Sequence, residues 1–183
     1  MADWWFTMEK EKPTGESVFL WDGPSPGDKL NDGFRPWLDV YPVSGKSRGA
    51  VLICPGGGYG DRMPHEGIMV AKCFNERGIP AVVVHYRIAP HRHPEPLMDL
   101  SRALRIVRSR AKEWNLKPDH LAVCGFSAGG HLAASLGVFW HKYPFTTEDN
   151  LASVSNRPDA MIPCYPVITS GPDGHNGSFL NML

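Results

Sequence analysis

Short apolar runs alternate along the chain with segments in which apolar residues recur every three or four positions. The runs at 50–54 (AVLIC), 81–84 (AVVV) and 121–124 (LAVC) are continuous, which is typical of parallel strands covered on both faces. Together with weaker patterns they predict strands at 17–21, 37–43, 50–54, 81–84, 121–124 and 160–167.

Three helices are predicted between these strands, at 66–77, 99–114 and 131–140. The first carries apolar residues at 69, 70, 73 and 74 and is expected to end at Gly78. The second has one apolar stripe, formed by Leu100, Leu104, Val107, Ala111 and Trp114. Because Arg102, Arg105 and Lys112 lie off this stripe, we expect them on a solvated helix face.

Alternating strands and helices predict an α/β fold with a mainly parallel sheet. A length of 183 residues corresponds to one domain. Residues 1–36 are rich in Pro, Gly and Trp and are predicted to form an irregular lead-in apart from the short strand at 17–21.

The balance of charge gives no sign of a polyanionic partner. The chain has 19 basic and 19 acidic residues and a pI of about 7.1. No window reaches the roughly 20 apolar residues of a membrane span, and the stretch at 1–16 lacks the apolar core of a signal peptide. We therefore expect a cytoplasmic protein that binds neither nucleic acid nor membranes.

The cysteines and histidines form no metal-binding pattern. None of the four cysteines is part of a C-x-x-C pair, so we expect reduced thiols, with a bridge between Cys54 and Cys124 as the alternative. The eight histidines have no matching carboxylates or cysteines at metal-ligand spacing. No metal or other cofactor is expected.

The strongest chemical motif is G-F-S-A-G at 125–129, between a predicted strand and a predicted helix. In this context G-x-S-x-G forms a nucleophile elbow, a sharp turn that exposes the serine hydroxyl. The N-terminus of the following helix favours developing negative charge. Ser127 is therefore the predicted nucleophile.

A second motif, P-G-G-G-Y-G at 55–60, follows the strand predicted at 50–54. Acyl transfer passes through an oxyanion that fixed backbone N–H donors stabilise, and we predict Gly57, Gly58 and Ala128 as these donors. Tyr59 is expected to border the acyl site. The alternatives are a plain loop or a phosphate-binding loop, but neither G-x-G-x-x-G nor Gly-Lys-Ser/Thr occurs here.

Several stretches resemble the α/β-hydrolases of the acetyl-esterase and acetylxylan-esterase-like group, which includes feruloyl-esterase-like proteins. They are VLICPGGGYG at 51–60, HEG at 65–67, VVVHYR at 82–87, GFSAGGHLA at 125–133 and CYPVIT at 164–169. The resemblance covers most of the chain from about Asp39 onward. It implies a cofactor-free serine hydrolase that removes small acyl groups, often acetyl on sugars.

The family places its catalytic acid and histidine after two strands that follow CYPVIT, and this sequence ends before both. We therefore expect a single α/β-hydrolase domain over 1–183 that lacks its last strands and hydrolyses esters weakly. Ala160–Val167 would then form an exposed sheet edge through which the chain self-associates.

Four alternatives remain open at this point. Asp173 and His175 could supply the acid and the base in the required order, or His131 could act as the base. The chain could be a non-catalytic, hydrolase-like module that binds a ligand or a complementing chain. It could also be a peptidase, although peptidases of this fold usually carry a propeller or lid domain.

Overall fold

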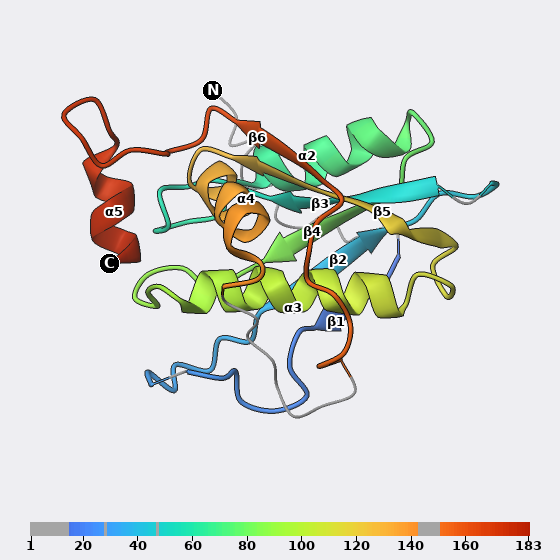
Figure 1. Ribbon diagram of the computed structural model, residues 1–183, viewed down its shortest axis with the longest axis horizontal. Coiled ribbons are helices and arrows are strands. Elements are labelled where there is room, and N and C mark those ends of the chain that lie inside the picture. Colours follow the sequence, from blue (N-terminus) through green and yellow to red (C-terminus); the bar gives the residue numbers. More distant parts are fainter. Residues whose placement is uncertain (1–14, 28, 47, 143–150) are drawn as a thin grey trace, which may run out of the picture.

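The computed structural model describes residues 15–27, 29–46, 48–142 and 151–183. Within these ranges a six-stranded sheet has the order β1-β2-β4-β3-β5-β6 (Figure 1). The strands are β1 (Ser17–Phe19), β2 (Trp37–Tyr41), β3 (Arg48–Cys54), β4 (Ala81–His85), β5 (Leu116–Phe126) and β6 (Ala160–Cys164). β4, β3, β5 and β6 are parallel to one another, while β2 pairs antiparallel with both β1 and β4.

Helices lie on both faces of the sheet. They are α2 (Pro64–Asn75), α3 (Glu95–Ser109), α4 (Ala128–Phe139) and α5 (Asn176–Met182). Alternate residues along each strand serve the two faces: Leu52 and Val82 pack in the cluster with α3 and α4, whereas Ile53 and Val83 pack in the cluster with α2. This double coverage explains why the central strands are continuously apolar and confirms the predicted α/β fold.

Every predicted strand is present, with small shifts at its ends. The largest is in β5, which begins at Leu116 rather than Leu121 because polar residues 117–120 form an exposed extension of the strand. The last strand ends at Cys164, so residues 165–167 of the predicted strand leave the sheet.

The edge predicted at 160–167 is present as the shorter strand β6, at 160–164. β6 pairs with β5 on one side, and on its other side the described residues provide no neighbouring strand. Met161 and Ile162 are exposed there.

The predicted helix at 99–114 is displaced toward the N-terminus. α3 begins at Glu95, because Pro96 is tolerated in a first helical turn, and the helix ends before Trp114. The expectation that Arg102 and Arg105 are solvated is wrong. Both are buried, with Arg102 donating to the Leu20 carbonyl and Arg105 to carbonyls of the segment that starts at Leu151.

The buried face of α2 also differs from the predicted one. Glu66, Gly67 and Ala71 face the sheet, whereas Met69 and Cys73 are exposed. The prediction is confirmed for Val70 and Phe74, which are partly buried against the same core cluster as Ala71, and wrong for Met69 and Cys73.

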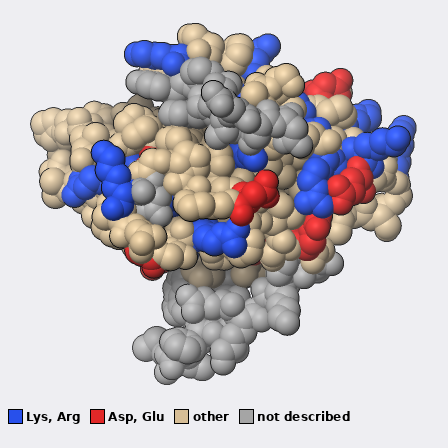
Figure 2. Space-filling model, turned by 90° about the horizontal axis from the view of Figure 1, so that it is seen from below, with Lys and Arg blue, Asp and Glu red and all other residues tan. Residues whose placement is uncertain are grey.

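The distribution of surface charge and the state of the cysteines agree with the balanced charge and the reduced thiols expected from the sequence. On the face seen in Figure 2, basic and acidic side chains are interspersed among uncharged ones. No helix among the described residues has the length and apolar character needed to cross a membrane. All four cysteines are free, and burial raises the pKa of the Cys54 thiol well above its ordinary value.

Candidate active site

Ser127 occupies a strained turn between β5 and α4. Its backbone has φ 49° and ψ −115°, outside the regions that non-glycine residues normally adopt. The turn brings backbone segments into contact: a Cβ on Gly129 would lie 2.0 Å from the Cys54 carbonyl oxygen. This geometry is that of a nucleophile elbow.

Hydrogen bonds hold the elbow on both sides. The Ser127 N–H donates to the Cys164 carbonyl at 3.0 Å. The Ser127 carbonyl accepts from His131 N at 3.0 Å and from Val167 N at 3.2 Å. A trans peptide directs its N–H opposite to its C=O, so the Ala128 N–H points away from these partners.

The glycine loop at 55–60 has its carbonyl groups fixed in the same way. Gly56 C=O accepts from Met63 N, and Gly57 C=O accepts from both Gly60 N and Asp61 N. The following N–H groups, those of Gly57 and Gly58, therefore point to the opposite side of the loop.

These amides remain available for a ligand. Within the described ranges no protein acceptor is recorded for the N–H groups of Gly57, Gly58 or Ala128. Positive φ angles of 130° at Gly57 and 62° at Gly58 require glycine there. Because a Cβ on Gly56 would lie 3.0 Å from Ser127 Cβ, the loop lies directly against the elbow. The structure thus brings together the glycine loop, Ser127 and Ala128. The role of Ser127 as nucleophile, and of Gly57, Gly58 and Ala128 as oxyanion donors, remains a prediction.

Tyr59 lies inside the protein rather than in an open acyl pocket. Its side chain is buried and its hydroxyl lies 2.8 Å from His131 Nδ1. Burial raises the pKa of this phenol well above its ordinary value. The predicted substrate contact gains no support from this position, because the ring packs beneath the loop.

No histidine of the described ranges hydrogen-bonds to the Ser127 hydroxyl. His131 is engaged with Tyr59, and His175 Nδ1 lies 2.9 Å from Ser178 Oγ. Among the described residues, no hydrogen bond or ion pair is recorded between Asp173 and either His131 or His175. The described residues also contain no cluster of three or more metal-ligating side chains.

α5 is an element that the sequence pattern missed. The polar segment after CYPVIT showed little periodicity, yet residues 176–182 form a helix against the glycine loop. Asn181 Nδ2 donates to Gly58 C=O at 2.8 Å, and a Cβ on Gly58 would lie 3.7 Å from His175 Cε1. The N-cap of the helix is His175, whose side chain accepts from the Ser178 backbone N–H at 3.2 Å, and since histidine is not among the preferred N-cap residues the sequence offered no clear start signal.

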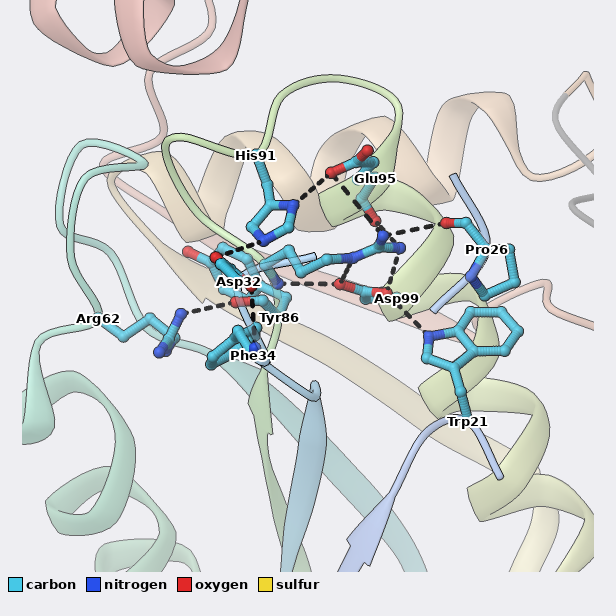
Figure 3. A network of polar contacts seen from close by, with 10 residues as sticks. Trp21, Pro26, Asp32, Phe34, Arg62, Tyr86, His91, Glu95 and Asp99 are labelled. Carbon is cyan, nitrogen blue, oxygen red and sulfur yellow. Dashed lines mark hydrogen bonds and ion pairs between the residues drawn. The ribbon is translucent and has the colours of Figure 1, made fainter. Parts of the chain in front are cut away.

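A buried ion pair supports the loop from below (Figure 3). Asp99 accepts from the Arg87 backbone N–H and guanidinium and from Trp21 Nε1, and both members of the pair are fully buried. This pair fixes the end of β4, where Tyr86 donates its hydroxyl proton to Pro55 C=O at 2.5 Å. Arg87 and Tyr86 lie in the stretch VVVHYR, so their contacts give that stretch a structural role.

A cavity of about 360 Å³ opens behind the glycine loop, between α2 and the ends of β2 and β4. Pro55 and Arg62 line it on the loop side, and Trp37 and His85 line it on the sheet side. Ser127 is not among its lining residues.

Comparison with known proteins agrees with this geometry. Endo-1,4-beta-xylanase B of Butyrivibrio fibrisolvens is 35% identical over 90% of this chain, and acetylxylan esterase of Xylanibacter ruminicola is 31% identical over 84%. The chain spans 26% and 30% of the length of these two proteins.

The solved structures include an acetyl ester-xyloside bifunctional hydrolase from Caldicellulosiruptor lactoaceticus. It superposes with a TM-score of 0.87 at 38% identity, covering 95% of this chain and 65% of its own. The BD-FAE family model matches residues 38–167. The expected resemblance is confirmed: the chain belongs to the BD-FAE family of α/β-hydrolases.

Proposed function

We propose that this protein is a serine carboxylic-ester hydrolase that removes small acyl groups through an acyl-enzyme on Ser127. In the first step Ser127 Oγ attacks the carbonyl carbon of the ester, its proton passes to a base, and the C–O bond to the alcohol breaks. Water then cleaves the Oγ–acyl bond. The N–H groups of Gly57, Gly58 and Ala128 stabilise the oxyanion in both steps.

One observation carries this proposal. The strained elbow serine lies beside a loop in which the Gly56 and Gly57 carbonyls accept hydrogen bonds, while the N–H groups of Gly57 and Gly58, on the opposite side, have no recorded protein acceptor. A plain connecting loop has no need of such an arrangement, because it leaves polar N–H groups without protein acceptors.

We further propose acetyl groups on carbohydrate as the substrate class. The support is that the similar proteins include an acetylxylan esterase and an acetyl ester-xyloside bifunctional hydrolase. No cofactor takes part in the proposed reaction.

A second candidate is a non-catalytic module that binds an ester or a complementing chain. It is favoured by the absence, in the described ranges, of a histidine side chain hydrogen-bonded to the Ser127 hydroxyl. In that case the oxyanion amides would bind a carbonyl or carboxylate oxygen without chemistry.

Hydrolysis of p-nitrophenyl esters separates the two candidates. The esterase proposal predicts release from the acetate ester that Ser127→Ala abolishes and that Ser109→Ala, which alters an exposed hydroxyl on α3, leaves intact. It also predicts that release falls as the acyl chain lengthens beyond about eight carbons. Release that Ser127→Ala leaves unchanged would support the binding module, and a preference for long chains would contradict the acetyl substrate.

A further inference from the structure

The first turn of α2 places one buried carboxylate between the two segments that flank Ser127. Glu66 Oε2 accepts from the Gly56 N–H at 2.7 Å, and Glu66 Oε1 accepts from the Tyr165 hydroxyl at 2.6 Å. Only 8% of Glu66 is exposed. Glu66 belongs to the stretch HEG at 65–67, which contributed to the family resemblance but did not predict a role for this residue.

Both partners of Glu66 adjoin the elbow. Gly56 begins the glycine run and lies next to Ser127, since a Cβ added to Gly56 would be 3.0 Å from the Ser127 Cβ. Tyr165 follows directly on Cys164, whose carbonyl accepts from the Ser127 N–H. The carboxylate therefore connects the oxyanion side of Ser127 to the β6 side.

The Glu66 carboxylate fixes the orientation of both of its donors, the Gly56 peptide and the Tyr165 side chain. The Pro55–Gly56 peptide is held at both ends, with its C=O bound by Tyr86 and its N–H bound by Glu66. Tyr165 has φ 34°, a strained value for a non-glycine residue, and its ring is mostly exposed. Without the carboxylate, the Gly56 amide would lose its only recorded acceptor and the Tyr165 hydroxyl would turn to solvent.

Charge and protonation fit a carboxylate acceptor. Desolvation and the hydrogen bond to Glu66 raise the pKa of Tyr165 to about 12, so the phenol stays a donor at neutral pH. Two other titratable side chains interact with this carboxylate: His65, with Nε2 at 4.0 Å from Oε1, and the buried phenol of Tyr86.

We propose that Glu66 is a positioning residue that holds the glycine loop and the segment after β6 in register with Ser127. The inference rests on the proposed esterase function. Glu66 itself touches no reacting atom. It orients the first peptide of the loop, which sets the direction of the amides that follow.

The test compares Glu66→Ala, Glu66→Gln and Tyr165→Phe with a control, Glu76→Gln, which alters an exposed carboxylate at the C-terminal end of α2. Glutamine keeps an oxygen for the Gly56 N–H and an amide for Tyr165, so it should restore most of what alanine removes. We expect Glu66→Ala to lower kcat for p-nitrophenyl acetate roughly 10- to 100-fold with little change in KM. Tyr165→Phe should have a smaller effect of the same kind.

Hydrogen exchange of the 55–61 peptide gives a readout that needs no activity. Exchange should be faster in Glu66→Ala and close to wild type in Glu66→Gln and Glu76→Gln. Equal kcat and equal exchange in Glu66→Ala and the control would overturn the inference. If Glu66→Ala does not fold, a Tyr165→Phe variant with unchanged kcat and a Glu66→Gln variant with lowered kcat would overturn it instead. If the wild type itself releases no product, the esterase proposal fails, and the exchange result still decides whether Glu66 holds the loop.

Discussion

The hydroxyl of Tyr59 lies 2.8 Å from Nδ1 of His131, joining the glycine loop to the nucleophile helix α4. A neutral imidazole protonated at Nε2 accepts this hydrogen bond, whereas an imidazolium has no acceptor to offer. Burial, with a smaller contribution from His93, lowers the pKa of His131 below its ordinary value of 6.5. The contact is therefore formed by the neutral histidine.

This contact predicts a pH-dependent stability. Since His131 binds a proton less readily when folded than when unfolded, the free energy of unfolding should fall as the pH drops below about 6.5. His131→Asn keeps an acceptor near the Nδ1 position and should flatten that fall, which urea unfolding between pH 5 and 8 would measure. His93, whose pKa burial also lowers, should account for part of the remaining slope. An unchanged slope in His131→Asn, matching that of the exposed control His120→Asn, would rule out this assignment.

The elbow predicts a sharp difference between two glycines. A methyl group on Gly129 would meet the Cys54 carbonyl at 2.0 Å, so Gly129→Ala must move backbone and should destabilise the protein by about 3 kcal/mol or more. Gly23→Ala is the matched control, since a Cβ there meets nothing within 4 Å. Thermal unfolding of both variants checks the prediction, and equal melting temperatures would contradict the close approach of β3 to α4.

The buried pair beneath the loop predicts a strongly non-additive pair of substitutions. Asp99→Leu leaves the Arg87 guanidinium buried with the Glu95 carboxylate at 3.8 Å in place of that of Asp99 at 2.8 Å, and should cost about 3–5 kcal/mol. Arg87→Met combined with Asp99→Leu removes both charges of the pair and should cost less than Asp99→Leu alone. Urea unfolding of the single and double variants tests this, and simple additivity would show that the two charges do not interact.

The apolar patterning of the chain predicted the sheet because its central strands are covered on both faces. Runs such as 81–84 can lie only in a buried strand of such a sheet, and the glycine spacing around Ser127 marks the elbow in the same direct way. These features are local, so the sequence alone carries them.

The features that the sequence missed depend on contacts between distant residues. Arg102 and Arg105 lie off the apolar stripe of their helix, which predicted a solvated position for both. In the folded chain their guanidinium groups are buried and donate hydrogen bonds to backbone carbonyls at residue 20 and at 151–152. α5 is too short to show a helical period in the sequence, and its contacts with distant residues, Phe179 on His131, Met182 on the core and Asn181 to Gly58 C=O, form only in the folded chain. Glu66 gave no signal because its partners are 10 and 99 residues away.

Self-association through the edge at 160–167 remains a prediction. Met161 and Ile162 are exposed on β6, whose outer side has no neighbouring strand among the described residues, and this favours pairing with another chain. Ile162→Lys should therefore shift the sedimentation coefficient toward the monomer. Val138→Lys, at an exposed position on α4, is the control. A monomeric wild type, or the same shift in both variants, would exclude the edge as the interface.

The central claim is that Ser127 forms an acyl-enzyme, and mass spectrometry of the chain after brief exposure to p-nitrophenyl acetate tests it most directly. Because no histidine side chain in the described ranges hydrogen-bonds to the Ser127 hydroxyl, we expect slow turnover, below the usual enzyme range of roughly 1–10³ per second. Slow deacylation should leave an acetyl group on the peptide that contains Ser127, and the group should be absent from Ser127→Ala. Acetylation confined to other residues, or equal product release from the Ser127→Ala chain, would contradict the account.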